Sequence, residues 1–311
     1  MKNRTVKELL FLYAKGVLMG AADSVPGVSG GTIAFITNIY EELIFSVRSI
    51  DFSLFTTLKR SGIKACWKQV NGSFLATLLA GIVSSLLLLA NLVLYLLEYH
   101  EQLLLSFFCG LILASTYYMA RQITVWNLGR FILVLTGIIL CVSLSFIPIQ
   151  QVEPSLWYVF IGGALSICAM ILPGISGAFI LLLLGLYAPV LSALKSFEFI
   201  MVVVFIAGCA SGLLSFTRVL TWLFEHHKNS TLAMLTGVLC GSLYSLWPWQ
   251  RGTAFIENKV GELEAVQFVP VLPGQYTETY AQDVNLFLCA GLFGVGFILV
   301  LWFESFAGKK I

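Results

Sequence analysis

Two apolar segments of this 311-residue chain are each interrupted by a Pro-Gly break, and the two breaks have nearly the same sequence. The first reads Pro-Gly-Val-Ser-Gly over 26–30, and the second reads Pro-Gly-Ile-Ser-Gly over 173–177. Such a break frees backbone N–H and C=O groups, which a membrane tolerates only where the break is buried in protein or lines a wet cavity. Matched breaks in two halves of a chain are the best sequence indication of a transporter's binding site.

The composition around the breaks requires a membrane. Hydrophobic residues make up 59% of the chain and charged residues 11%, where soluble domains carry about 25% charged residues. We therefore expect an all-α integral membrane protein with no nucleic-acid partner. Seven cysteines are scattered without a CxxC pair, and the three histidines lack zinc spacing, so we expect no metal site and no cofactor.

The breaks belong to an internal repeat that covers nearly the whole chain. The motif recurs at an offset of 147, Gly110 matches Gly237 at 127, and Gly137 matches Gly291 at 154. Each half is thus one broken segment followed by three apolar runs near the length of about 20 residues that crosses a bilayer as a helix. The first repeat, 1–150, has its hairpin at 8–47 and spans at about 74–97, 103–119 and 131–148; the second, 151–311, has its hairpin at 155–194 and spans at about 199–223, 231–247 and 285–303.

Charge predicts the orientation of these segments. Three spans and a hairpin give each half an odd number of crossings, so the second repeat has to be inverted relative to the first. With both termini in the cytoplasm, 15 of the 18 basic residues fall on the cytoplasmic side, which is a strong positive-inside pattern. The long loop 248–284 is then external.

Arm lengths indicate that the broken segments are re-entrant hairpins. Lys15 to Pro26 and Gly27 to Glu41 would be about 17 and 21 Å long as helices, a little over half of a hydrocarbon core of roughly 30 Å. Full crossing would leave Lys15, Glu41 and Glu42 deep in lipid, at a cost of a few kcal/mol each. Full crossing remains the alternative.

Residues at the two breaks could hold an anion. Half-helices that begin inside the membrane direct unpaired N–H groups and a positive dipole end into the cavity, and serine hydroxyls add donors. Phosphate is the obvious ligand. The alternative is a pair of kinks where small residues only allow close packing. The predicted substrate-binding residues are Ser24, Pro26, Gly27, Ser29, Gly30, Gly31 and Thr32 in the first segment, and Pro173, Gly174, Ser176 and Gly177 in the second.

Two charged residues complete the predicted site. Asp23 is the acid that we place inside the membrane, three residues before the first break, and intramembrane carboxyl groups often mark proton pathways. It is the candidate for proton coupling, and the alternative is a hydrogen bond within the hairpin. Arg218 lies in an apolar run, where it could bind a phosphate or extend to the inner interface.

Residues 20–44, GAADSVPGVSGGTIAFITNIYEELI, and residues 171–191, ILPGISGAFILLLLGLYAPVL, resemble the bacterial polyprenyl-phosphate transporter family. The resemblance covers nearly the whole chain. It implies a multi-pass translocase of the bacterial cytoplasmic membrane that returns undecaprenyl phosphate, the lipid carrier of cell-wall glycans, from the outer to the inner leaflet. The residues alone predict an anion-binding transporter with an inverted repeat, and the resemblance adds the lipid. The family's signature falls on Asp23, Pro26, Gly27, Ser29, Gly30, Gly31 and Thr32, and on Pro173, Gly174, Ser176 and Gly177.

Two other functions remain open. A membrane polyprenyl-diphosphate phosphatase also carries a PG-x-S motif, but we expect a basic residue beside its serine and nearby glutamates. Here Ser29 is followed by Gly30 and Gly31, and Asp23 is the acid that accompanies it. The other alternative is a channel or transporter for a small soluble anion. Assembly of the chain into a homo-oligomer also remains open.

Overall fold

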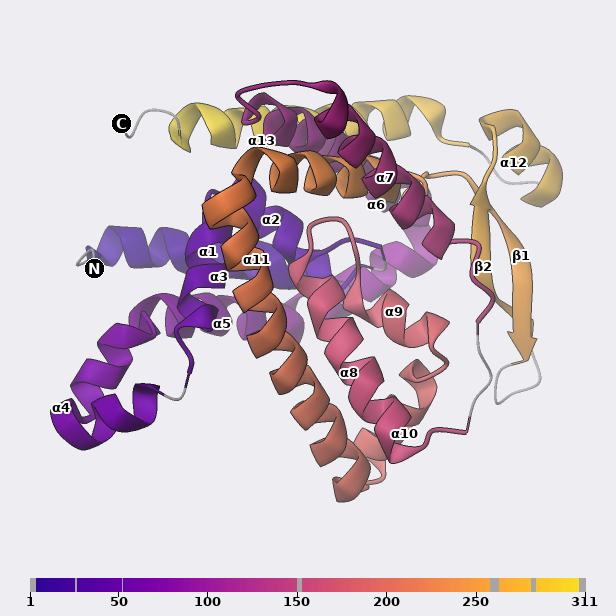
Figure 1. Ribbon diagram of the computed structural model, residues 1–311. Coiled ribbons are helices and arrows are strands. Elements are labelled where there is room, and N and C mark those ends of the chain that lie inside the picture. The colour runs from indigo at the N-terminus through magenta and orange to yellow at the C-terminus, as the bar shows by residue number, and fades with distance from the viewer. Residues whose placement is uncertain are drawn as a thin grey trace. The chain divides into compact units, whose positions relative to one another are not determined.

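A computed structural model describes residues 4–25, 27–51, 53–149, 153–257, 263–280 and 284–307 (Figure 1). The chain divides into two compact units, and each takes segments from both predicted repeats. Unit 1 comprises Met1–Asn91 and Pro148–Thr231, and unit 2 comprises Leu92–Ile147 and Leu232–Ile311.

Unit 1 contains two hairpins with the same order of elements. Each has a long apolar helix, a tip, a seven-residue helix and a nine-residue helix. A capping box between Thr5 and Glu8 fixes the start of the first hairpin. The elements of unit 1 are α1 (Val6–Asp23), α2 (Gly30–Ile36), α3 (Tyr40–Arg48), α4 (Ser53–Gln69), α5 (Gly72–Leu88), α8 (Leu156–Ile171), α9 (Gly177–Leu183), α10 (Tyr187–Lys195) and the first part of α11 (Phe199–Ser242).

The returning arm of each hairpin is bent, and our expectation of one continuous arm was wrong. α2 has seven residues, which makes it about 10 Å long. Asn38 follows with φ 56°, and Gly185 has φ 66° at the equivalent point 147 residues later. A left-handed residue cannot continue a right-handed helix, and asparagine and glycine tolerate that conformation best. In the second hairpin α9 and α10 meet at 105°.

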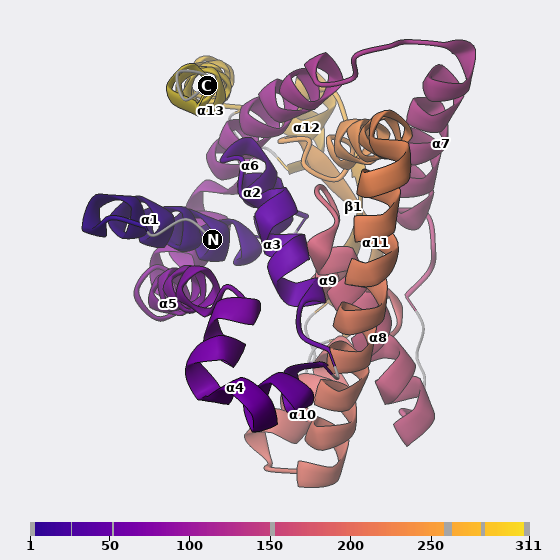
Figure 2. The ribbon, with the colours of Figure 1, turned by 60° about the vertical axis from the view of Figure 1, so that its left-hand side comes forward.

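Glycines allow the long hairpin helices to pack closely on their neighbours in unit 1. α1 lies against α5, where the Cα of Gly16 faces the Leu78 carbonyl and Gly81 faces the Tyr13 carbonyl (Figures 1 and 2). A methyl group at either glycine would collide with the opposing backbone. α8 packs on α11 in the same way. The equivalent contacts there are Gly163 with the Phe205 carbonyl and Gly208 with the Phe160 carbonyl.

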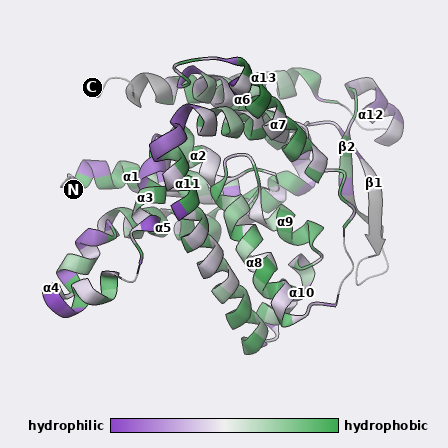
Figure 3. Ribbon diagram, in the orientation of Figure 1, coloured by the Kyte–Doolittle hydropathy of each residue, from purple (hydrophilic) through white to green (hydrophobic). Residues whose placement is uncertain are grey.

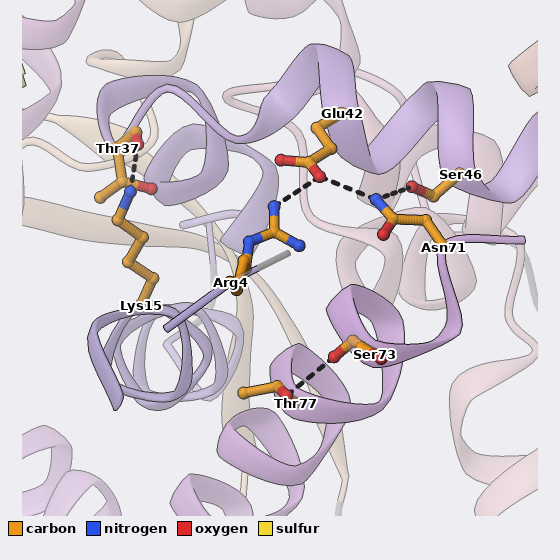
Figure 4. A network of polar contacts seen from close by, with 8 residues as sticks. All are labelled: Arg4, Lys15, Thr37, Glu42, Ser46, Asn71, Ser73 and Thr77. Carbon is orange, nitrogen blue, oxygen red and sulfur yellow. Dashed lines mark hydrogen bonds and ion pairs between the residues drawn. The ribbon is translucent and has the colours of Figure 1, made fainter. Parts of the chain in front are cut away.

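A polar network holds the start of α1 against α3 and α5 (Figure 4). The Arg4 guanidinium lies 2.5 Å from the Glu42 carboxylate. Asn71, directly before α5, donates to the same carboxylate at 2.7 Å and to the Ser46 hydroxyl at 3.3 Å. Glu42 thereby connects three helices that are distant in the sequence.

Unit 2 is built from helix pairs, and each pair combines one helix of the first predicted repeat with one helix of the second. α6 meets α13 where Gly110 faces the Phe293 carbonyl, and α11 meets α7 where Gly237 faces the Val134 carbonyl. Gly110 and Gly237 are repeat partners at the offset of 127. The helices of this unit are most of α6 (Ala90–Arg121), α7 (Leu128–Leu144), the second part of α11, α12 (Pro273–Tyr280) and α13 (Leu286–Ala307).

The same contacts correct one pairing of the sequence repeat. Gly137 faces the Met234 carbonyl, and Gly296 faces the Phe107 carbonyl. Because Phe107 and Met234 are repeat partners at 127, Gly137 corresponds to Gly296, at an offset of 159. Our match of Gly137 with Gly291 was therefore wrong, and no other described segment places an atom within 4 Å of the Cβ position of Gly291. The glycine-rich run of α13 offers several matches, and only packing selects among them.

A β-hairpin and a short helix occupy the predicted external loop, where we predicted no element. β1 (Gln250–Glu257) pairs antiparallel with β2 (Leu263–Pro270), and α12 follows. Phenylalanine, isoleucine and valine in these strands have high β propensity. The indole N–H groups of Trp247 and Trp249 anchor the loop by donating to the carbonyls of Val271 and Val284, at 2.9 and 3.1 Å.

The helices agree with the predicted all-α membrane class apart from this β-hairpin. Among the described residues, three helices are long and apolar enough to cross a membrane, and the number rises to five if each bent pair counts as one span. Apolar residues also dominate α7, α8 and α9 (Figure 3). α6 and α11 are each interrupted at a histidine, His100 and His227, which are repeat partners at 127. The inverted orientation and the cytoplasmic termini stay predictions.

Candidate functional site

The tip of the first hairpin is held by its own serine. Ser29 caps α2, and its Oγ accepts the Gly31 amide at 3.1 Å. The Ser29 carbonyl accepts the Thr32 amide at 2.9 Å. Gly27 has φ 84°, a conformation that glycine adopts without steric cost. Pro26, which we predicted as a site residue, lies outside the described residues.

The side chain of Asp23, the last residue of α1, reaches across the first tip to the start of α2. Its Oδ1 accepts the Gly30 amide at 2.6 Å. Ser24 turns the other way, and its hydroxyl donates to the Gly20 carbonyl at 2.9 Å within its own hairpin arm. The Gly30 and Gly31 amides, which we expected to face an anion, are therefore bonded to Asp23 and Ser29 in this conformation. A hydrogen bond within the hairpin is the alternative that the sequence left open for Asp23.

The second tip has the same backbone turn and a different cap. Gly174, directly after Pro173, has φ 88°. Ser176 precedes α9 and is buried, but its side chain makes no capping hydrogen bond. Gly177 packs on α8, where the Ser166 hydroxyl donates to its carbonyl at 2.8 Å. The two tips are thus alike in conformation and different in hydrogen bonding.

The two tips contact each other inside unit 1. The Ser29 hydroxyl donates to two carbonyls of the second hairpin. Its Oγ lies 3.0 Å from the Met170 oxygen and 3.2 Å from the Leu172 oxygen. Thr32 Oγ1 accepts the Gly174 amide at 3.0 Å. Ser29 and Thr32 are both buried. Three residues that the sequence singled out, Ser29, Thr32 and Gly174, are therefore brought together from segments more than 140 residues apart.

Two glycines of the first tip leave room for these contacts. A Cβ at Gly31 would lie 2.6 Å from the Ile171 carbonyl oxygen, across the junction of the tips. A Cβ at Gly30 would lie 2.5 Å from a carboxylate oxygen of Asp23. One glycine thus makes room for backbone of the other hairpin, and its neighbour makes room for a side chain.

Arg218 is not joined to the tips. It lines a groove between α4 and α11, and the lining of this groove contains no tip residue. The sequence placed Arg218 correctly on a long apolar helix, but it gave no information about which element lies opposite. Its neighbours in the groove are apolar residues of α4 and the carboxylate of Asp51.

Sequence reasoning missed Lys15, which we read as a cytoplasmic topology charge. Its Nζ donates to the Thr37 carbonyl at 2.6 Å, at the end of α2. The cation therefore stabilises the free carbonyl end of the helix that Ser29 caps. The available signal was a charge that interrupts an apolar run about three turns before the break.

Comparison with known proteins gives one family. A family model described as undecaprenyl phosphate translocase-like matches residues 19–264, which is well over half of the chain and includes the tips of both hairpins. This confirms the predicted resemblance. No solved structure shows significant similarity to the chain.

Two curated relatives carry the name polyprenyl-phosphate transporter. The relative from Vibrio cholerae is 43% identical over 300 residues, which cover 96% of this chain and 97% of the relative. The relative from Staphylococcus aureus is 29% identical over 252 residues, or 75% of this chain and 84% of the relative. Both names describe a transporter and not an enzyme. Together with the apolar helices, these similarities identify a multi-pass membrane protein.

Proposed function

This chain belongs to the undecaprenyl phosphate translocase-like family, and we propose that it transports undecaprenyl phosphate or a closely related polyprenyl phosphate. The proposed direction is from the outer to the inner leaflet of a bacterial cytoplasmic membrane. The names of the two relatives support the substrate class. The direction comes from the resemblance described above.

The contact between the hairpin tips is the observation that best supports a phosphate site in unit 1. Ser29, Thr32 and Gly174 place two hydroxyls and a backbone amide at one junction. Ser176 adds a third hydroxyl on the second tip that is not used for capping. A phosphate monoester has several strong acceptor oxygens, so hydroxyl and amide donors match it. We propose that the head group replaces some of these internal hydrogen bonds.

Asp23 adds a proton step to this proposal. Its carboxylate holds the Gly30 amide in the conformation described here. A phosphate that approached Gly30 would meet a like charge, which is unfavourable at short range. Protonation of Asp23 removes that charge and weakens its hold on the amide. We propose that a proton on Asp23 accompanies binding of the phosphate.

The long apolar tail does not have to enter the protein with the head. A polyprenyl chain is soluble in the hydrocarbon core, whereas a phosphate is not. The protein therefore needs a polar passage for the head group alone, with the tail in lipid beside it. The short, bent hairpin arms place polar tips among apolar helices, which suits this division.

The test is leaflet exchange of a short fluorescent polyprenyl phosphate in proteoliposomes. We expect Ser176→Ala to slow exchange while leaving thermal unfolding unchanged, because its hydroxyl caps nothing. Ser29→Ala should lower both the exchange rate and the melting temperature, since it loses the cap of α2 and the bond to the second hairpin. Arg218→Ala should slow exchange if the arginine meets the head group along its path. Ser84→Ala is the control, because that hydroxyl donates to the Ala80 carbonyl within its own helix, α5.

Several outcomes would contradict the proposal. Equal exchange by the three site variants and wild type would remove the site assignment. Phosphate release from a polyprenyl diphosphate by the purified protein would favour a phosphatase. Uptake of a labelled soluble anion in the absence of the lipid would favour a small-anion transporter.

A further inference from the structure

α4 folds back on itself, although its residues are helical on both sides of the bend. A straight helix would separate Ser53 from Gln69 by about 24 Å. Instead the Gln69 side chain donates to the Ser53 hydroxyl at 2.6 Å and accepts from the Thr57 hydroxyl at 2.7 Å. Gly62, with φ 76°, makes the bend. Apolar residues of both short arms line the same groove.

An apolar groove of about 660 Å³ lies between this bent helix and α11, inside unit 1. Proteins enclose drug-sized ligands in spaces of about 300–1,000 Å³, so the groove suits a segment of a lipid chain rather than a whole one. Ile63 is 76% exposed and Trp67 49% exposed, so apolar surface is left open here. The lining includes Leu54, Leu58, Ile63 and Trp67 from α4, and Leu214 and Arg218 from α11.

Charge decides which lipid fits the groove. Arg218 is the cation of the lining, and other basic residues lie along α4 outside the groove. A phosphate monoester carries a charge of about −1.5 to −2 at pH 7, more than the single charge of a phosphodiester lipid. An arginine in the lining of an apolar groove is therefore matched to a chain that ends in a phosphate monoester. The basic residues are Lys59, Arg60, Lys64 and Lys68, as expected for a helix that lies on an anionic membrane surface.

Asp51 is the acid of the groove lining. Its carboxylate accepts the Ser53 hydroxyl at 2.5 Å and the Ser53 amide at 2.8 Å. These hydrogen bonds, with a smaller contribution from the charge of Arg218, lower the pKa of Asp51 below its usual value. Asp51 is therefore ionised at neutral pH, and its negative charge opposes the attraction of Arg218 for an incoming phosphate.

We propose that this groove, named here the α4–α11 groove, is a second binding site for the transported lipid. The first isoprene units lie along Leu58 and Trp67, and the phosphate pairs with Arg218. Loop 48–73 and Arg218 both fall on the predicted cytoplasmic side, so the groove would hold the lipid at the inner leaflet. The inference rests on the proposed function, because it takes polyprenyl phosphate as the occupant.

The experiment uses the full-length protein in nanodiscs with a diazirine analogue of geranylgeranyl phosphate. Light cross-links the bound analogue, and mass spectrometry of peptides locates the label. We expect label on α4 and on α11 near Leu214, removed by unlabelled geranylgeranyl phosphate and not by the alcohol geranylgeraniol. Arg218→Gln should reduce the labelling roughly tenfold, as expected for loss of a charge-assisted hydrogen bond. Lys195→Gln, which removes an exposed charge on α10, should leave it unchanged.

Two further variants test the groove without relying on Arg218. Leu58→Trp fills the apolar part and should abolish the labelling while the protein stays folded, because Leu58 is 46% exposed. Asp51→Asn removes the opposing charge and should strengthen it severalfold. Equal competition by geranylgeraniol or by phosphatidylglycerol, or labelling that ignores Arg218→Gln, would overturn the proposal.

Leaflet exchange in the same preparation separates this inference from the proposed function. Exchange without label in the groove refutes the second site alone. Failure of the wild-type protein to exchange the lipid refutes the proposed function, whatever the cross-links show.

Discussion

The carboxylate of Asp23 accepts the amide of Gly30 at 2.6 Å, across the tip of the first hairpin. That amide belongs to the first residue of α2, where the sequence led us to expect a bound anion. The protein thus places an anion of its own at this position. Asp23 and a phosphate are competitors for the same donor under the proposed function.

The first prediction concerns proton coupling through Asp23. Asp23→Asn keeps the size of the side chain and removes the group that takes up a proton. Wild-type exchange should become faster as the external pH falls, because protonation releases the Gly30 amide. The variant should exchange at a rate that does not depend on pH, measured with the fluorescent lipid over a pH series. Glu153→Gln, at an exposed carboxylate, is the control, and a wild-type pH profile in Asp23→Asn would exclude the coupling.

The second prediction compares two adjacent glycines. Gly31→Ala places a methyl group 2.6 Å from the Ile171 carbonyl of the other hairpin, where backbone has to move. Gly30→Ala places one against the Asp23 carboxylate, which can rotate away. We expect Gly31→Ala to destabilise by about 1–3 kcal/mol, as overpacking generally does, and Gly30→Ala by less. Thermal unfolding in detergent measures both, and the reverse order would mean that the hairpins do not meet at Gly31.

The third prediction removes a hydrogen bond between the hairpins. Thr32→Val keeps the shape of the side chain and deprives the buried Gly174 amide of its acceptor. An unpaired buried amide costs about 1–3 kcal/mol, so the melting temperature should fall. Thr37→Val is the matched control, because the Thr37 hydroxyl donates within its own helix to Ile33. If both variants melt alike, the bond to Gly174 contributes nothing.

The fourth prediction tests the corrected repeat in unit 2. Gly137→Ala and Gly296→Ala each drive a methyl group into a carbonyl of the paired helix, so both should destabilise by about 1–3 kcal/mol. Gly291→Ala has open space around its Cβ position and should be neutral. Denaturation in detergent distinguishes these results. A loss of stability in Gly291→Ala equal to that in Gly137→Ala would restore the pairing at offset 154.

The membrane class and the position of the hairpin tips could be predicted because they depend on composition and on local breaks. The pairs Pro26-Gly27 and Pro173-Gly174 interrupt apolar runs, and this pattern is read directly from the residues. The bends at Asn38 and Gly185 were missed, although both residue types tolerate positive φ. A single Asn or Gly in an apolar run has too many interpretations for the sequence to choose one.

The partners of the site residues could not be predicted. Ser29 bonds to the carbonyls of Met170 and Leu172, and every residue has a carbonyl, so no side-chain pattern marks them. Arg218 was recognised as unusual, but its groove depends on the reversal of α4 at Gly62. Tertiary contacts of this kind follow from the packing of whole segments and not from local sequence.

The glycine contacts of unit 2 have a consequence for a single repeat. Gly110 is covered by a helix of the later repeat, and Gly237 by a helix of the earlier one. A single repeat, made alone, would lack the helix that packs on its own glycines. If one copy were made alone, it could cover its glycine stripe only by pairing with a second, identical copy.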